Sequence, residues 1–133
     1  MNNLSNLVGR FGLSAIFVLS GVAKLGAGYE GTQGYMEAMG VSGGLLPVVI
    51  AAEILGGLAV AAGFLTRWAA LGLAVFSVLS AFLFHFQLAD QMQFINFFKN
   101  IAIAGGFLVL AAHGAGRFSI DGLIAARRAK GGA

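Results

Sequence analysis

Long apolar runs separated by short polar segments dominate the chain. Four of the runs, at about residues 7–25, 45–65, 68–88 and 93–113, reach the roughly 20 residues that a transmembrane helix needs. Pro47 falls in the first turn of the second run, where its missing N–H costs no helical hydrogen bond. The pattern predicts an all-α membrane protein, a four-transmembrane-helix bundle in a single domain at 1–133, with a tail at 114–133.

The polar segments between the runs differ in length. Those after the second and third runs are so short that only tight hairpins fit them. The first, at about 26–44, is long, and its TQGYMEAMG segment is compatible with a short interfacial helix.

The apolar part of the first run, Phe11–Ala23, also has the length of a signal-peptide apolar segment. Arg10 is the only basic residue before that part, so the basic segment that normally precedes a signal-peptide core is missing. Cleavage would leave three spans and separate Lys24 from the other polar groups. We therefore expect the first run to stay in the protein as a span.

Composition supports the membrane assignment and excludes several chemistries. Hydrophobic residues make up 59% of the chain and charged residues 10%, against about 25% charged in a typical soluble domain. The absence of cysteine excludes disulfides, thiolate nucleophiles and thiolate metal sites. The net charge of +3 does not indicate nucleic acid, because the basic residues form no patch with interleaved aromatic residues.

Basic residues indicate the orientation of the spans. The loops and ends on one side of the predicted bundle hold most of them: Arg10, Arg67, Arg117, Arg127, Arg128 and Lys130. The loops on the other side carry the acidic residues Glu30, Glu37 and Asp90. Because cytoplasmic segments are enriched in Lys and Arg, we expect both the N- and the C-terminus in the cytoplasm.

With this orientation, polar residues from all four spans fall in the outer half of the bilayer. They are Lys24, Glu53, His85, Asn96, Lys99 and Asn100. Glu53 lies roughly 10 Å from the outer end of its span at about 1.5 Å per residue. A carboxylate at that depth is costly unless it is paired, so we predict that Glu53 meets at least one of Lys24 and Lys99. These residues would then line a ligand-binding pocket, with Lys99 and Asn100 forming one wall opposite Glu53.

Simpler interpretations of the same residues remain open. Lys24 and Lys99 lie near enough to the boundary to extend their ammonium groups to the membrane surface. His85 is also compatible with a plain boundary position, and Asn96 and Asn100 with hydrogen bonds between helices. The Lys–Glu pair itself is compatible with a purely structural role.

Other motifs carry no chemistry. GAGYEG at 26–31 matches a dinucleotide-binding pattern but follows a membrane helix instead of a strand. His85 and His113 are expected on opposite sides of the membrane, which disfavours a bis-histidine haem. We expect no metal site and no cofactor held by the chain alone.

Five segments, taken in order, resemble the DoxX family of small four-helix bacterial membrane proteins. They are RFGLSAIFVLSGVAKL (10–25), AAEILGGLAVAAGFLTRWAAL (51–71), FHFQ (84–87), FFKNIAIAGGFLVL (97–110) and GAGRFSID (114–121). The resemblance implies a multi-pass protein of the bacterial cytoplasmic (inner) membrane. It links some relatives to thiosulfate:quinone oxidoreduction and others to redox-stress complexes with soluble partners. The residues that match the family's polar pattern are Lys24, Glu53, His85, Lys99 and Asn100.

Two classes of function follow. In the first, the protein is a membrane subunit associated with redox chemistry that binds a quinone or a small anion. Glu53 and His85 would be its catalytic, proton-transferring residues, and a soluble or membrane partner would supply electrons. In the second, it is a non-enzymatic assembly or small-solute binding and transport protein whose Lys–Glu cluster only specifies the fold. Either class leaves room for a homo-oligomer in the lipid bilayer.

Overall fold

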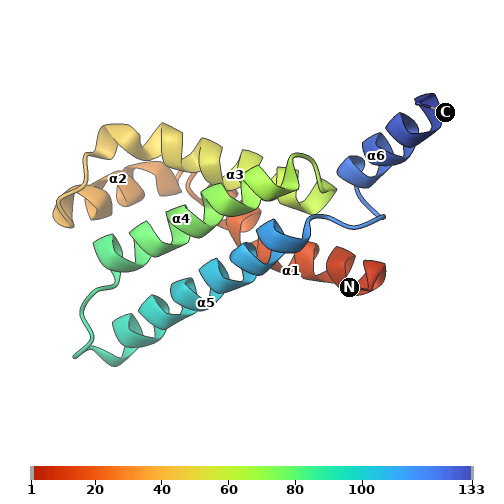
Figure 1. Ribbon diagram of the computed structural model, residues 1–133. Helices are drawn as coiled ribbons and strands as arrows, with labels where there is room; N and C mark the ends of the chain where they lie inside the picture. The colour runs from red at the N-terminus through yellow and green to blue at the C-terminus, as the bar shows by residue number, and fades with distance from the viewer. Residues whose placement is uncertain (1, 133) are drawn as a thin grey trace.

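Helices account for nearly all the regular structure in the computed structural model, which describes residues 2–132 and has no strand in that range (Figure 1). The elements are α1 (Asn3–Ala23), α2 (Gly28–Ala38), the 3-10 helix η1 (Gly43–Leu45), α3 (Leu46–Ala62), α4 (Thr66–Phe84), α5 (Gln91–His113) and α6 (Ile120–Gly131). Four segments are long and apolar enough to cross a membrane: α1, η1 with α3, α4 and α5. The all-α, four-span prediction is confirmed.

Two span ends differ from their predicted positions. The first span begins at Asn3 instead of about residue 7, because the Asn2 side chain accepts a hydrogen bond from the Leu4 N–H at 2.8 Å. The third ends at Phe84 instead of about residue 88. The next helix then starts from Asp90, whose carboxylate accepts from the Gln93 N–H at 3.1 Å.

The four spans form two closely packed pairs, α1 with α3 and α4 with α5, which α3 and α4 join. α1 and α5 touch over a much shorter length. In Figure 1 the bundle spreads apart toward the end that carries α2 and the turn between α4 and α5. The uneven pairing leaves space between the pairs at that end.

Glycines allow the close approach of α1 and α3. A Cβ on Gly21 would lie 2.5 Å from the Ile54 Cγ1, and one on Gly57 would lie 2.8 Å from the Val18 Cγ2. Such small-residue contacts are the usual way in which membrane helices bring their backbones together. They place the end of α1 beside the middle of α3.

Two apolar clusters surround this contact. The main core fills the middle of the bundle with Phe17, Val60, Ala70, Leu73, Ala74, Ala104, Phe107 and Leu110. A smaller cluster seats α2 on α3 through Met36, Leu46 and Ile50. The connection predicted to hold a short helix therefore does hold one, α2, and it packs over one end of the bundle.

The segment predicted only as a tail contains α6, which the sequence pattern did not indicate. The Ser119 hydroxyl caps α6 by accepting from the Gly122 N–H at 2.9 Å. The Asp121 carboxylate accepts from the Leu65 and Thr66 N–H groups, each at 2.9 Å, and so caps the first turn of α4. α6 is thus fixed to the turn between α3 and α4 and extends away from the bundle (Figure 1).

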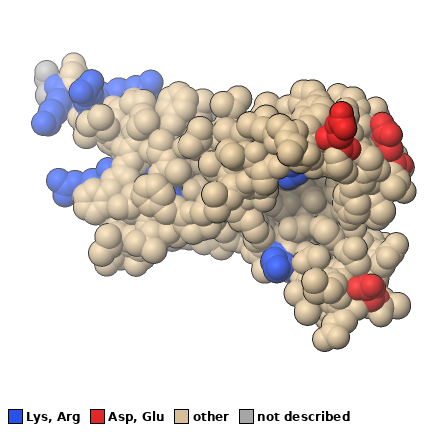
Figure 2. Space-filling model, turned by 180° about the vertical axis from the view of Figure 1, so that it is seen from behind, with Lys and Arg blue, Asp and Glu red and all other residues tan. Residues whose placement is uncertain are grey.

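Charge divides between the two ends of the molecule. Figure 2 shows basic groups gathered at the end with the termini and acidic groups at the opposite end. Further basic atoms lie beside a hollow near the acidic end. The separation agrees with the distribution of charges along the sequence.

Candidate functional site

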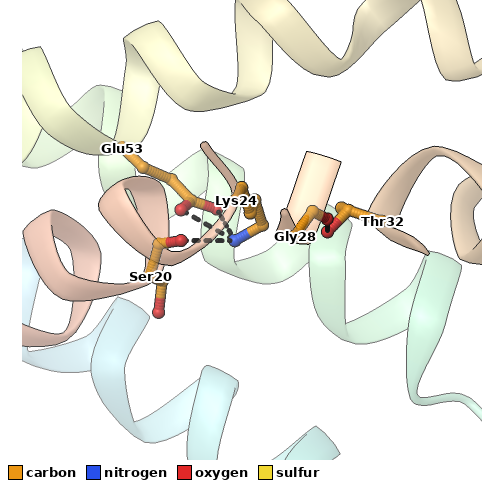
Figure 3. Close-up of polar contacts among 5 residues, drawn as sticks. All are labelled: Ser20, Lys24, Gly28, Thr32 and Glu53. Carbon is orange, nitrogen blue, oxygen red and sulfur yellow. Dashed lines mark hydrogen bonds and ion pairs between the residues drawn. The ribbon is translucent and has the colours of Figure 1, made fainter. Parts of the chain in front are cut away.

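An ion pair between α1 and α3 lies at the centre of the polar half of the bundle. The Lys24 Nζ donates to both carboxylate oxygens of Glu53 at 2.9 Å and to the Ser20 carbonyl oxygen at 3.3 Å (Figure 3). Glu53 is 5% exposed, whereas the Lys24 side chain is 23% exposed. The predicted pairing of Glu53 is confirmed, with Lys24 as its partner.

The surrounding backbone explains why these two side chains meet. Glu53 belongs to the buried stripe of α3, between Ile50 and Gly57, so its carboxylate points into the bundle. Lys24 ends α1 as its C-cap, and Gly21 one turn earlier brings α1 against Glu53 and Ile54. Because the three ammonium N–H groups have three acceptors, Lys24 is fully hydrogen-bonded without any ligand.

Two clefts meet at the ion pair. The first, of about 350 Å³, lies between α3 and α4 beneath α2 and is mainly apolar, with Val49, Leu79 and Leu83 in its walls. The second, of about 210 Å³, lies between α1 and α5. Both clefts are lined by the same five residues at their junction: Lys24, Glu53, Phe76, Ser80 and His85. The site is therefore a two-branched cavity with the charged pair where the branches join.

Aromatic rings close the inner side of this cavity. Phe17 packs edge-on against Phe76, with ring centroids 6.1 Å apart, and against Phe107, at 5.4 Å. The three rings come from α1, α4 and α5. They separate the polar cavity from the end of the bundle that carries the termini.

His85 joins the cavity to the turn between α4 and α5. Its Nδ1 lies 2.7 Å from the Gln93 Oε1. Since an amide oxygen only accepts, this contact favours the tautomer with the hydrogen on Nδ1, in which Nε2 is an acceptor. His85 therefore has one nitrogen held by Gln93 and one that makes no hydrogen bond within residues 2–132.

The three predicted site residues of α5 differ in burial and in whether they line the cavity. Asn100 is half-buried and lines the second cleft. Lys99 is exposed and lines neither cleft, and Asn96 is half-buried but also lines neither. The prediction that Lys99 forms a wall opposite Glu53 is wrong, because Phe97, Ala104 and Phe107 set the inner face of α5. One residue along a helix turns the side chain by about 100°, which takes Lys99 out of the cavity.

Sequence reasoning treated Arg10 only as an orientation signal, yet it is 1% exposed. Its guanidinium donates to the Asn6 Oδ1 at 2.9 Å, to the carbonyl oxygens of Val60 at 3.3 Å and Ala61 at 2.8 Å, and to that of Phe118. It thereby binds the C-terminal carbonyl groups of α3, where the helix dipole favours a cation. Arg10 lies seven positions after Asn3, the first residue of α1, and nothing in the local sequence indicated this long-range role.

Asp121 is a second residue that sequence reasoning missed. Burial favours its neutral form, but hydrogen bonding from Thr66 and Leu65 and the charge of Arg10 outweigh burial and hold the pKa of Asp121 below its ordinary value. The Asp121 N–H also donates to the Gly63 carbonyl oxygen at 2.8 Å. Arg10 and Asp121 thus stabilise the end of the bundle opposite the cavity.

These features define a class: a small membrane protein with four spans and a Lys–Glu pair in a branched cavity near one end. The model of the DoxX family matches residues 5–86, which include most of α1, all of α2 to α4 and both members of the pair. The chain belongs to the DoxX family.

Two curated relatives extend the similarity to most of the chain. "Inner membrane protein YqjF" of Escherichia coli (strain K12) is 48% identical over 124 residues, which are 93% of this chain and 95% of the relative. "Inner membrane protein YphA" of the same organism is 33% identical over 122 residues, or 86% of each protein. No solved structure matches the chain significantly. The predicted location, a multi-pass protein of the inner membrane, agrees with these names and with the four spans.

Proposed function

We propose that the protein binds a quinone in the branched cavity, as the membrane subunit of a redox system whose electrons come from a partner protein. The observation that carries the proposal is the meeting of a long apolar cleft and a polar cleft at the Lys24–Glu53 pair. The apolar cleft has the size of a small-ligand pocket. Its walls of Val49, Leu79 and Leu83 suit an isoprenoid chain.

The junction offers the groups that a quinone head requires. Ser80 at the junction and Asn100 in the adjoining polar cleft can donate to its carbonyl oxygens, and the His85 Nε2 can accept from a hydroxyl group of the reduced quinol. A bound quinone supplies chemistry that takes up two electrons and two protons. His85 and Glu53 are the groups beside it that can hold a proton, while Lys24 keeps the Glu53 carboxylate in place.

A small anion is a weaker candidate than a quinone. A small anion would need a cation in addition to the one that pairs with Glu53, and Lys99 lines neither cleft. The remaining cation, Lys24, is already paired with Glu53. An anion at the junction would meet a neutral pair.

The non-enzymatic candidate, in which the pair only specifies the fold, is favoured by one observation. Lys24 and Glu53 satisfy each other, with the help of the Ser20 carbonyl, so the site is stable without a ligand. The two candidates make different predictions for a purified protein.

The test is extraction in a mild detergent followed by analysis of bound lipids. We expect quinone to co-purify with the wild-type protein and with Lys99→Gln, whose side chain lies outside the cavity. Ser80→Leu, which fills the junction, and Glu53→Gln should lose the quinone while retaining helical circular dichroism. Absence of quinone from the wild type, even after addition of a short-chain analogue, would reject the proposal in favour of the structural role.

A further inference from the structure

The two branches of the cavity differ in how their polar groups are hydrogen-bonded. In the α3/α4 cleft the Thr32 hydroxyl donates to the Gly28 carbonyl at 2.8 Å and the Tyr35 hydroxyl to the Phe84 carbonyl at 3.3 Å. In the α1/α5 cleft the side chains of Ser20 and Asn100 make no hydrogen bond within the described residues 2–132. Only the second branch therefore presents unpaired polar groups of its own.

The side chains of Ser20 and Asn100 both lie on the wall of the α1/α5 cleft. Figure 3 shows the Ser20 hydroxyl on the side away from Lys24, toward α5. Asn100 and Ile103 of α5 line the same cleft. Six of the ten residues that line this branch are polar: Ser20, Lys24, Glu53, Ser80, His85 and Asn100.

Lipid cannot satisfy such groups. Hydrocarbon offers no hydrogen-bond partner, so an unpaired polar group that faces it is energetically costly. Water can, because the cleft of about 210 Å³ has room for several molecules, each of which needs two to four polar partners. The polar lining supplies those partners.

We propose that the α1/α5 cleft is a water-filled branch through which water and protons reach Glu53 and His85. This deepens the proposed function, since the apolar branch would hold the chain of the ligand while the polar branch exchanges protons with its head. Phe17 and Phe76, which are packed edge-on against each other, line this branch on the side nearer the main core.

Single-cysteine labelling tests the proposal, and the chain has no cysteine of its own. Ser20→Cys and Asn100→Cys are placed in lipid nanodiscs and treated with a charged methanethiosulfonate reagent, which reacts with the hydrated thiolate. The matched controls are Leu19→Cys and Phe98→Cys. They lie one and two positions from the test residues, line neither cleft, and are 69% and 49% exposed on the surface of the bundle.

We expect both test cysteines to react at least about tenfold faster than their controls, because only a solvated thiolate is reactive. Equal rates in test and control positions would overturn the proposal, and so would fast reaction at only one of the two test positions. The labelling is done without quinone. A protein that labels as expected but binds no quinone would therefore reject the proposed function and leave the aqueous branch in place.

Discussion

Lys24 and Glu53 neutralise each other's charge within the bundle. A variant that keeps only one of them leaves an unpaired charge, which destabilises the fold. We predict that Lys24→Met lowers the free energy of unfolding by about 3 kcal/mol, since breaking a buried pair leaves an uncompensated charge. Glu53→Gln should cost less, because Lys24, at 23% exposure of its side chain, can turn toward the surface and leave the site.

The double variant Lys24→Met/Glu53→Gln separates pairing from packing. It should recover part of the stability that Lys24→Met loses, because no charge then remains buried. Unfolding of all three variants in the same detergent gives the coupling energy. Strictly additive losses would show that the two charges do not act as a pair.

Gly63 is the residue whose conformation and surroundings both exclude a side chain. Its φ is +69°, and a Cβ there would lie 2.3 Å from the Ser119 Cβ and 2.6 Å from the Arg10 Nη1. We predict that Gly63→Ala lowers the free energy of unfolding by at least about 2 kcal/mol, from left-handed strain and overpacking together.

The matched control is Gly72→Ala in α4, where a Cβ would meet nothing within 4 Å. Alanine is the better helix former by up to about 1 kcal/mol, so this variant should unfold no more easily than the wild type. Thermal unfolding of the two variants measures the difference. Equal destabilisation by both would contradict the packing of α6 against Gly63.

At the scale of elements, α4 begins without a side-chain cap from its own segment. Leu65 precedes it with a φ of 47°, and Asp121 from the far end of the chain receives its first N–H groups. We predict that Asp121→Asn lowers the free energy of unfolding at neutral pH by about 1 kcal/mol, the usual value of a cap.

The pH dependence of unfolding tests whether the charge of the Asp121 carboxylate causes this stabilisation. The folded-state pKa of Asp121 lies below its ordinary value of 3.8, so ionised Asp121 stabilises the protein at neutral pH and this contribution is lost as pH falls below about 4. The gap in unfolding temperature between wild type and Asp121→Asn should therefore narrow between pH 5 and about pH 2. A gap that stays constant over this range would exclude the charge as the source.

The elements also show what the sequence could predict. Apolar runs and the cost of an unpaired charge were enough for four spans and for the pairing of Glu53. They could not predict which face of α5 points into the bundle. The packing of Phe97 and Phe107 determines that face, so that Asn100 lines the cavity and Lys99 does not. Nor could local patterns indicate the contacts of Asp121, because its partners lie 55 and 56 positions away.

For the whole molecule, the charge separation in Figure 2 bears on how the bundle sits in the membrane. The end with the termini carries the exposed basic residues Arg67, Arg117 and Arg127, and the opposite end carries Glu30 and Asp90. The positive-inside rule then predicts both termini in the cytoplasm. The branched cavity would lie in the outer half of the bilayer.

Labelling of intact cells tests this orientation. We predict that Asp90→Cys, in the exposed turn before α5, reacts with a membrane-impermeant thiol reagent in whole cells, whereas Arg127→Cys in α6 reacts only after the membrane is opened. Both positions are exposed in the structure, so access to the reagent depends on the side of the membrane and not on burial. The reverse pattern would place the cavity in the cytoplasmic half, where the aqueous branch would take its protons from the cytoplasm.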